Sequence, residues 1–327
     1  MDIKQINEAA KRLDGRIFPT PLMSSPILNE IAGRRILLKP ECLQHTGSFK
    51  YRGAFAAISK LSKNALANGV VSYSSGNHAQ GIALAAQQHN CTSMIVMPED
   101  APKLKINNTK RLGSEIKLYN RTEESRENIT LQLAKERDLT IIRPYDEPMV
   151  IAGQGTIGLE IARDAKSYGI RNADVLICCG GGGLTSGIAL ALEANAPGLR
   201  ARTCEPEGFD DTARSLAEGI ICANEKLSGG ICDAIMAPNP GELTFPIMRR
   251  LCGPGLVVSE DQLLQAMVAA FRHLKLVLEP SGAVALAAAL FQKHSSISDP
   301  VIVVLSGGNV DANVFAQALA IDRDFAI

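Results

Sequence analysis

The sequence has no excess of charge of either sign and no long, uninterrupted hydrophobic segment. Lys and Arg together number 34, as do Asp and Glu, and the isoelectric point is near 7.0. Proteins that bind nucleic acids or anionic membranes usually present a basic face, so neither partner is expected. No apolar run is long enough, and free enough of glycine and charge, to span a bilayer.

Patterns typical of zinc sites, disulfide frameworks and secretion signals are missing as well. The eight cysteines include no CxxC pair, and the five histidines show no HExxH spacing. We therefore expect neither a zinc site nor a set of disulfides. The N-terminal segment MDIKQINEAAKRLDG is typical of an amphipathic helix and lacks the apolar core of a signal peptide, which predicts a cytoplasmic location.

The chain is long enough, at 327 residues, for about two domains. Short β-rich runs such as VVSYSS, TSMIVMP, DVLICC and VIVVLSGG alternate with longer helical patterns. This alternation predicts βαβ units, and therefore an α/β fold with parallel sheets and helices on both faces. No internal repeat or low-complexity tract interrupts it.

Small and polar residues directly follow three of the predicted strands, at SSGNHAQG (74–81), GGGGL (180–184) and SGGNVD (306–311). Ligands of open parallel sheets bind beyond the carboxyl ends of the strands. We therefore expect the three loops to converge on one pocket.

Four consecutive glycines, Gly180 to Gly183, follow a predicted buried strand and open a predicted helix. Backbone N–H groups at such a helix start can bind a phosphate, and side chains would obstruct it. A tight structural turn would need fewer glycines. The phosphate could instead belong to a dinucleotide, with Glu205 at the end of the next strand binding a ribose, as in an NAD(P)-dependent oxidoreductase or a nucleotide-binding regulatory module.

One lysine stands at the predicted start of a helix in TGSFKYRG (46–53). A lysine that forms a Schiff base with an aldehyde cofactor must present a neutral amine, and burial or a nearby positive dipole lowers its pKa toward that state. Lys50 meets this condition. The oxidoreductase alternative assigns no role to Lys50 or to the loop that begins at Ser306.

Seven motifs occur together in one order between about Ile17 and Asp311: GSFKYRGA, SSGNHAQG, AGQGTIGLE, GGGGL, EPEGFDD, LEPSGAVALAA and SGGNVD. In this combination the sequence resembles the fold-type II pyridoxal-phosphate enzymes, specifically the serine/threonine dehydratase and serine racemase group. The resemblance implies two three-layer domains built on parallel sheets, as in the tryptophan synthase β-like architecture. It implies a large domain of residues 1–68 and 148–327 and a small, mobile domain of residues 69–147 that binds the substrate carboxylate.

The resemblance also implies a cofactor site. Lys50 would carry pyridoxal 5'-phosphate as a Schiff base and remove the α-proton of the substrate. The other implied cofactor contacts are Phe49, Asn77, Gly180, Gly181, Gly182, Gly183, Leu184, Glu279 and Ser306. Ser306 would face the pyridine nitrogen, and a neutral hydroxyl there favours elimination over transamination.

Substrate contacts are implied for Ser74, Ser75, Asn77, His78 and Arg126. The first four lie in a predicted strand-to-helix loop whose amides and hydroxyls would hold a carboxylate. Ser75 would sit on the face of the cofactor opposite Lys50 and supply the second proton donor that racemisation needs. Arg126 could equally be an exposed helix residue paired with a neighbouring glutamate.

The acidic turn EPEGFDD matches the metal-binding members of the group. The implied ligands of a divalent cation, Mg²⁺ or alternatively Ca²⁺ or Mn²⁺, are the carboxylates of Glu205 and Asp211 and the carbonyl of Phe209. A solvated acidic turn is the alternative. If the turn binds a metal, Glu205 is not free for a ribose.

The expected activity is that of a pyridoxal-phosphate-dependent ammonia-lyase (dehydratase), which converts a β-hydroxy amino acid to a 2-oxo acid and ammonia. A serine or aspartate-type racemase with the same Lys50 and Ser75 pair is the alternative. The segment CDAIMAPNPGELTFP (232–246) departs from the group's pattern, which puts serine and threonine in doubt as substrates and leaves a 3-hydroxyaspartate open. A homodimer is expected from the family.

Overall fold

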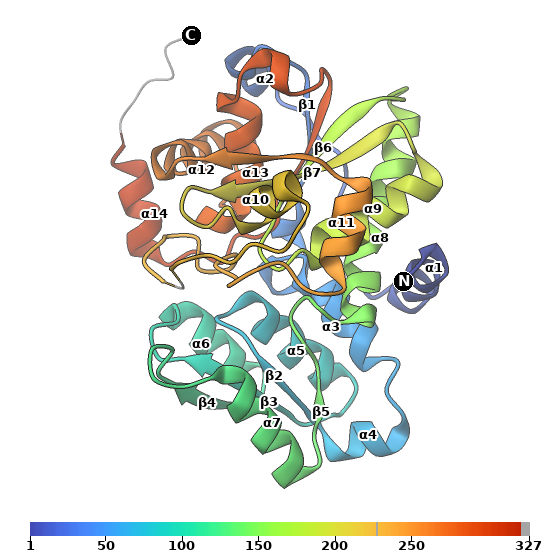
Figure 1. The fold of residues 1–327 in the computed structure, drawn as a ribbon, viewed down its shortest axis with the longest axis vertical. Coiled ribbons are helices and arrows are strands. Elements are labelled where there is room, and N and C mark those ends of the chain that lie inside the picture. The colour runs from blue at the N-terminus through green and yellow to red at the C-terminus, as the bar shows by residue number, and fades with distance from the viewer. Residues whose placement is uncertain (227, 322–327) are drawn as a thin grey trace.

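The structure, a computed structural model, describes residues 1–226 and 228–321 as two parallel β-sheets flanked by helices. The larger sheet has the order β1-β9-β6-β7-β8 and the smaller has the order β4-β3-β2-β5. They lie toward opposite ends of the long axis of the molecule (Figure 1). The predicted α/β class is confirmed. The strands are β1 (Ile36–Lys39), β2 (Val70–Tyr73), β3 (Ser93–Pro98), β4 (Glu115–Tyr119), β5 (Thr140–Ile141), β6 (Ala173–Cys178), β7 (Leu199–Pro206), β8 (Gly253–Val258) and β9 (Val301–Val304).

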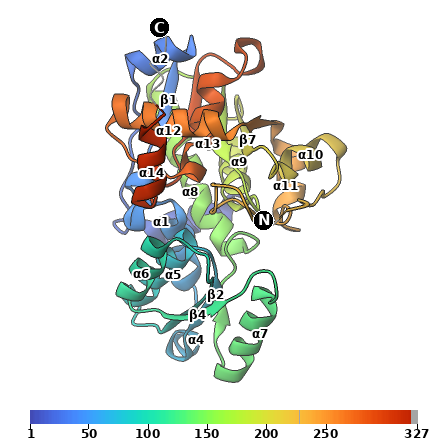
Figure 2. The same cartoon turned by 90° about the vertical axis from the view of Figure 1, so that its left-hand side faces the viewer.

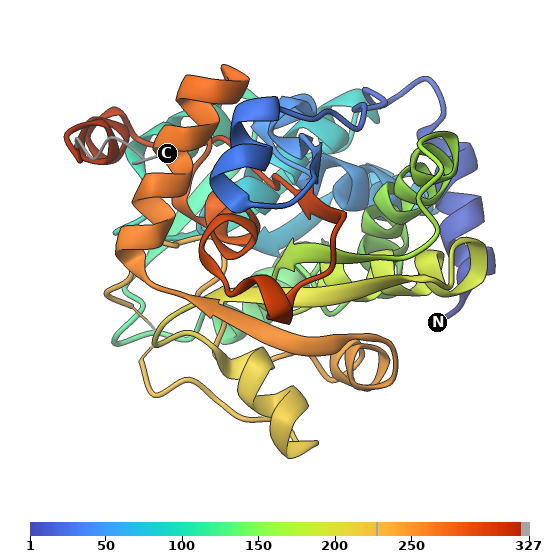
Figure 3. The same cartoon turned by 90° about the horizontal axis from the view of Figure 1, so that it is seen from above.

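Helices cover the larger sheet on both faces. Strands β6 and β9 are buried along their whole length, which is why they read as continuous apolar runs. Helices α9 and α13 contact β6 and β7 from opposite sides, and α8 packs on α9 while α12 packs on α13 (Figures 2 and 3). The helices are α1 (Ile3–Leu13), α2 (Pro26–Ala32), α3 (Lys50–Ile58), α4 (Lys63–Asn68), α5 (Asn77–Gln88), α6 (Lys103–Arg111), α7 (Arg126–Arg137), α8 (Pro148–Ser167), α9 (Gly183–Asn195), α10 (Asp211–Glu218), α11 (Thr244–Leu251), α12 (Glu260–Leu274), α13 (Pro280–Phe291) and α14 (Ala312–Leu319).

The smaller sheet takes all four of its strands from residues 70–141. Helices α5 and α7 pack on β2 and β3 from opposite sides (Figure 2). A single hydrophobic cluster runs from this sheet through α3 to α1 and α8, so apolar contacts cross the expected domain boundaries. Among the described residues, no helix is both long enough and apolar enough to cross a membrane.

Helix α3 lies between the two sheets and packs on α5 and α8. All of its residues after Lys50 are buried. A Cβ atom added to Gly153 of α8 would lie only 2.5 Å from the carbonyl oxygen of Arg52, so the close approach of the two helices requires a glycine. Arg52 is fully buried and pairs with Glu41 at 2.8 Å and Glu160 at 2.6 Å. These contacts fix the place of Lys50, the first residue of α3.

Candidate active site

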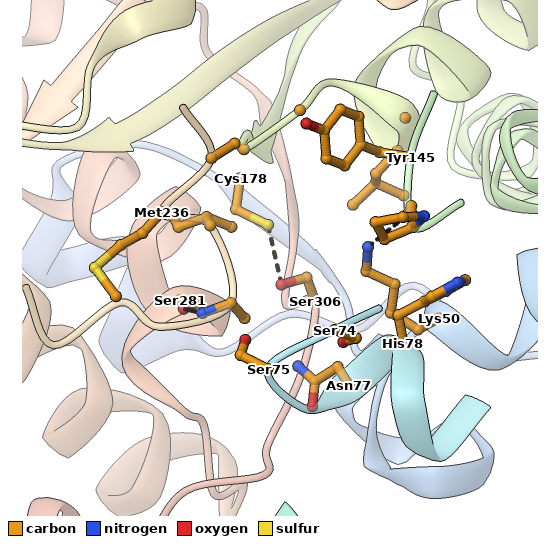
Figure 4. A pocket seen from close by; sticks show the side chains of 18 of the residues that line it. Lys50, Ser74, Ser75, Asn77, His78, Tyr145, Cys178, Met236, Ser281 and Ser306 are labelled. Atoms are coloured by element: carbon orange, nitrogen blue, oxygen red, sulfur yellow. Dashed lines mark hydrogen bonds between the residues drawn. The ribbon is translucent and has the colours of Figure 1, made fainter. Parts of the chain in front are cut away.

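A pocket with about 920 Å³ of empty space, part of which is open to solvent, lies between the two sheets, at the carboxyl ends of β2, β6 and β9. All of the predicted cofactor and substrate residues line this one pocket: Phe49, Lys50, Ser74, Ser75, Asn77, His78, Arg126, Gly180, Gly181, Gly182, Gly183, Leu184, Glu279 and Ser306. Figure 4 shows several of them around the cavity. Segments as distant in sequence as the loops after β2 and β9 therefore meet here.

The amine of Lys50 points into the pocket from the N-terminus of α3. Its Nζ donates a hydrogen bond to the carbonyl of Pro144 at 2.9 Å (Figure 4) and lies 5.2 Å from the centre of the Phe49 ring. Burial lowers the pKa of Lys50 to about 8, although Cys178 and Glu279 partly oppose the shift. The side chain is thus far closer to a neutral, nucleophilic amine than an exposed lysine is.

The glycine loop joins β6 to α9 and leaves the helix start open. Gly182 caps α9 with a φ of 89°, and no side chain caps the helix. A Cβ atom on Gly181 would lie 2.1 Å from the ring of Tyr145, so a larger residue does not fit there. Uncapped N–H groups of a thirteen-residue helix provide a site for a phosphate.

Ser306 follows β9 and is almost fully buried beside Cys178, the last residue of β6. The Cys178 thiol donates a hydrogen bond to Ser306 Oγ at 3.0 Å (Figure 4). Burial raises the pKa of Cys178 to about 11, so the thiol keeps the proton that it donates. Because that bond occupies an acceptor position of Oγ, the hydroxyl hydrogen of Ser306 remains available to a ring nitrogen in the pocket.

The loop from Ser74 to His78 connects β2 to α5 and is held by residues from the other side of the pocket. Ser75 Oγ donates to the carbonyl oxygen of Asp233 at 3.2 Å. The Asn77 amide donates to the carboxylate of Glu279. Burial lowers the pKa of His78 to about 3, and the charge of Lys50 adds to the shift. His78 is therefore neutral and a poor proton acceptor, as expected if Lys50 is the base.

Arg126 begins α7 and reaches the pocket beside an aromatic ring. Its guanidinium lies 5.0 Å from the centre of the Tyr73 ring and bonds Glu127 at 2.8 Å. The side chain is 25% exposed, which leaves donors free for a ligand. Arg126 thus combines the predicted pairing with a neighbouring glutamate and a place at the pocket.

Comparisons with known proteins agree with this geometry. Residues 13–307 match the family described as pyridoxal-phosphate dependent enzyme. The L-threo-3-hydroxyaspartate ammonia-lyase of Saccharomyces cerevisiae is 40% identical over 318 residues, covering 97% of this chain and 96% of the relative. The serine racemase of Dictyostelium discoideum is 38% identical, with 97% of each chain covered. The chain belongs to the pyridoxal-phosphate-dependent enzymes.

The fold agrees with that of solved members of this family. The solved structure of maize serine racemase superposes with a TM-score of 0.89 at 36% identity, covering 98% of this chain and 97% of the other. The predicted fold-type II architecture is confirmed. In the pocket of this pyridoxal-phosphate-dependent enzyme, the amine of Lys50 and the uncapped start of α9 are both present.

The predicted metal residues lie outside this pocket, at the start of α10. The carboxylate of Glu205 accepts the backbone N–H groups of Thr212 at 2.9 Å and Ala213 at 2.7 Å. Asp211 Oδ1 accepts a hydrogen bond from the Asn224 amide at 2.6 Å, while Asp211 Oδ2 is buried and has no hydrogen-bond partner in the part of the chain that the structure describes. Burial raises the pKa of Asp211 to about 7 and that of Glu205 well above its usual value.

The burial of these two acids argues against a ribose site. Glu205 is fully buried, so a nucleotide ribose cannot reach it. The oxidoreductase alternative therefore has no acid at this position to bind a ribose. The described residues include no group of three or more Asp, Glu, His or Cys side chains that could hold a metal ion. A cation here would therefore also need carbonyl oxygens, such as that of Phe209, and water.

Several pocket residues escaped the sequence analysis, chiefly Tyr73, Tyr145, Asp233 and Ser281. Lys105, which pairs with Asp233, escaped it as well. Lys105 lies on the polar helix α6 and has the sequence surroundings of a solvated lysine. Only its partners, which are 128 and 174 residues away, reveal its burial. Tyr145 lies between Pro144 and Pro148 in the connection from β5 to α8, where the prolines indicate a loop but not a pocket residue.

Proposed function

We propose that this enzyme is an ammonia-lyase that converts a β-hydroxy amino acid to a 2-oxo acid and ammonia, with pyridoxal phosphate as cofactor. The observation that carries the proposal is the partly buried amine of Lys50, with its lowered pKa, in one pocket with the open start of α9 and with Ser306. The cofactor supplies an aldehyde and a ring that withdraws electrons from the substrate α-carbon. Lys50 would hold the cofactor and take the α-proton.

The other pocket residues would set the cofactor and the substrate in place. Gly180 to Gly183 and the Leu184 amide would bind the cofactor phosphate, with Phe49, Asn77 and Glu279 around the ring. The loop from Ser74 to His78 would hold the substrate carboxylate through its N–H groups. Neutral Ser306 would leave the ring a moderate electron sink, which favours loss of the β-hydroxyl.

A 3-hydroxyaspartate is the substrate that the pocket supports best. Such a substrate carries a second carboxylate, and Arg126 places a guanidinium with free donors at the pocket. A named relative, the ammonia-lyase of Saccharomyces cerevisiae, acts on L-threo-3-hydroxyaspartate. In segment 232–246, which differs from the pattern of the group, Ile235, Met236 and Ala237 line the pocket. They would limit the space for other β-substituents.

Racemisation is the second candidate activity, and Ser75 is the observation that favours it. Its hydroxyl lines the pocket and is held by the Asp233 carbonyl, so it could return a proton to the face opposite Lys50. The Dictyostelium discoideum relative is named a serine racemase.

Three features complete the proposal. Glu205, Asp211 and the Phe209 carbonyl would bind a divalent cation, with Mg²⁺ as the first choice. Residues 69–147 would close over the substrate and exclude water. A homodimer in the cytoplasm is the expected state, and it stays a prediction.

The test is the absorption spectrum and turnover of the purified protein and of Lys50→Ala. The unaltered protein should show a band that borohydride bleaches, and should form a 2-oxo acid and ammonia from a 3-hydroxyaspartate isomer faster than from serine or threonine. Lys50→Ala should lose the band and at least about 10³-fold in rate. The exposed Lys63→Ala is the matched control and should retain both. A colourless protein that pyridoxal phosphate cannot reconstitute would overturn the proposal.

A further inference from the structure

Lys105 is a buried lysine at the edge of the pocket, and its charge is shared by two acids. Its side chain is 1% exposed, and its Nζ lies 2.8 Å from Asp233 Oδ2 and 2.8 Å from Glu279 Oε2. Lys105 comes from α6, beside the smaller sheet, whereas its two partners come from segments beside the larger sheet. The ammonium therefore joins the two sides of the pocket.

The stem of Lys105 also supports the loop that is to hold the substrate carboxylate. A Cβ atom on Gly76, at the centre of that loop, would lie 2.0 Å from Lys105 Cδ. The backbone of the loop thus rests directly on the methylene groups of the lysine. A glycine is needed at position 76 because of this contact, since any side chain there would displace Lys105.

The two acids that bind Lys105 hold the same loop from the other side. Glu279 accepts a hydrogen bond from the Asn77 amide through Oε1, the oxygen that Lys105 does not use. The backbone carbonyl of Asp233 accepts from Ser75 Oγ at 3.2 Å. Lys105 therefore contacts the loop directly at Gly76 and indirectly at both neighbouring residues.

We propose that Lys105 is a positioning residue for substrate binding, which sets the loop of residues 74–78 against Asp233 and Glu279. An ammonium is required because two carboxylates face each other across the pocket edge, and one buried carboxylate beside another without a cation is costly. Without it, Asp233 and Glu279 would separate or take up a proton, and Asn77 and Ser75 would lose the partners that orient them. The part of the inference that concerns substrate rests on the proposed function.

The test compares Lys105→Met, which keeps the stem and removes the charge, with Lys103→Met on the exposed face of the same helix. Hydrogen exchange of a peptide containing residues 74–78 is measured first, without added substrate. Lys105→Met should accelerate exchange there by roughly tenfold or more, because local opening becomes easier. Lys103→Met should match the unaltered protein.

Turnover then separates positioning from mere stabilisation. Lys105→Met should raise KM by about tenfold, as expected when one partner of a buried charge pair is lost, with a smaller fall in kcat. Lys105→Arg keeps the positive charge, so its KM should lie between that of Lys105→Met and that of the unaltered protein. Loop exchange and KM that stay unchanged, or a lower melting temperature with loop exchange unchanged, would overturn the inference.

Two further measurements keep the inference testable. If Lys105→Met does not fold, Asp233→Asn removes one arm of the bridge, and exchange at residues 74–78 should still rise; no rise would count against the inference. If the unaltered protein turns over no amino acid, the proposed function fails, whereas the exchange comparison still decides whether Lys105 positions the loop.

Discussion

Two pairs of acids that are wholly or partly buried in this enzyme differ in how their charge is compensated. At the pocket, Asp233 and Glu279 share the ammonium of Lys105. At the start of α10, Glu205 and Asp211 receive backbone and amide N–H groups, and no ion pair with a lysine or arginine is present at either acid among the described residues. A buried carboxylate without a compensating charge takes up a proton or binds a cation. The charge of the first pair is compensated within the chain, whereas the second pair is left to take up protons or, under the proposal above, a cation.

Of the changes considered, removal of divalent cations should have the largest effect on stability. The effect should arise at Glu205 and Asp211, the pair of acids at the start of α10 (the α10 pair). Asp211 has a pKa of about 7 in the cation-free fold, above its value in the unfolded chain. Protonated Asp211 therefore stabilises the fold at low pH, and this stabilisation is lost as pH rises from about 4 to about 7. The loss in the free energy of unfolding is roughly 2–4 kcal/mol. In a chelator, the melting temperature should fall by several degrees over this range.

Added Mg²⁺ should remove most of that loss at pH 7 and above, because a bound cation favours the ionised acids. Melting curves at several pH values, with chelator and with Mg²⁺, make the comparison. Identical curves under both conditions would mean that the α10 pair binds no divalent cation.

Asp211→Asn should change the free energy of unfolding by a smaller amount, and the sign of the change should depend on whether a cation is present. Asparagine keeps the shape and removes the charge, so without a cation the variant should be more stable than the unaltered protein by about 1–2 kcal/mol at pH 7. With Mg²⁺ present the order should reverse, because the variant lacks a ligand. Chemical unfolding in both buffers measures this. A variant that is less stable in both would show that the charge of Asp211 is not the destabilising feature.

Asp233→Asn should have the smallest effect on stability. Lys105 and Glu279 still form a neutral pair after the change, so we expect a loss of about 1 kcal/mol or less and no dependence on chelator. The same unfolding experiment applies. A strong response of this variant to Mg²⁺ would remove the distinction between the two pairs.

The sequence predicted the residues whose local pattern is unusual, and it missed those whose role comes from distant contacts. Four glycines in a row, a lysine at a helix start and polar loops after buried strands are visible in short windows. The four glycines, the lysine and residues from each loop line the pocket. Lys105 is not visible in this way, because the acids that bury it lie in other elements. The α/β class could be predicted from the alternation of β-rich runs and helical patterns. The exact domain boundary could not be predicted in this way, because apolar contacts through α3 cross it.

The strand order of the two sheets also bears on how the chain emerges from the ribosome. The smaller sheet uses strands that follow one another between residues 70 and 141, so it can assemble while the rest is still being made. In the larger sheet, β1 lies beside β9, with Ile36 opposite Val301. β1 therefore cannot pair with β9 until the chain is nearly complete. Until then, the edge of β1 that pairs with β9 is open to a chaperone that binds nascent chains.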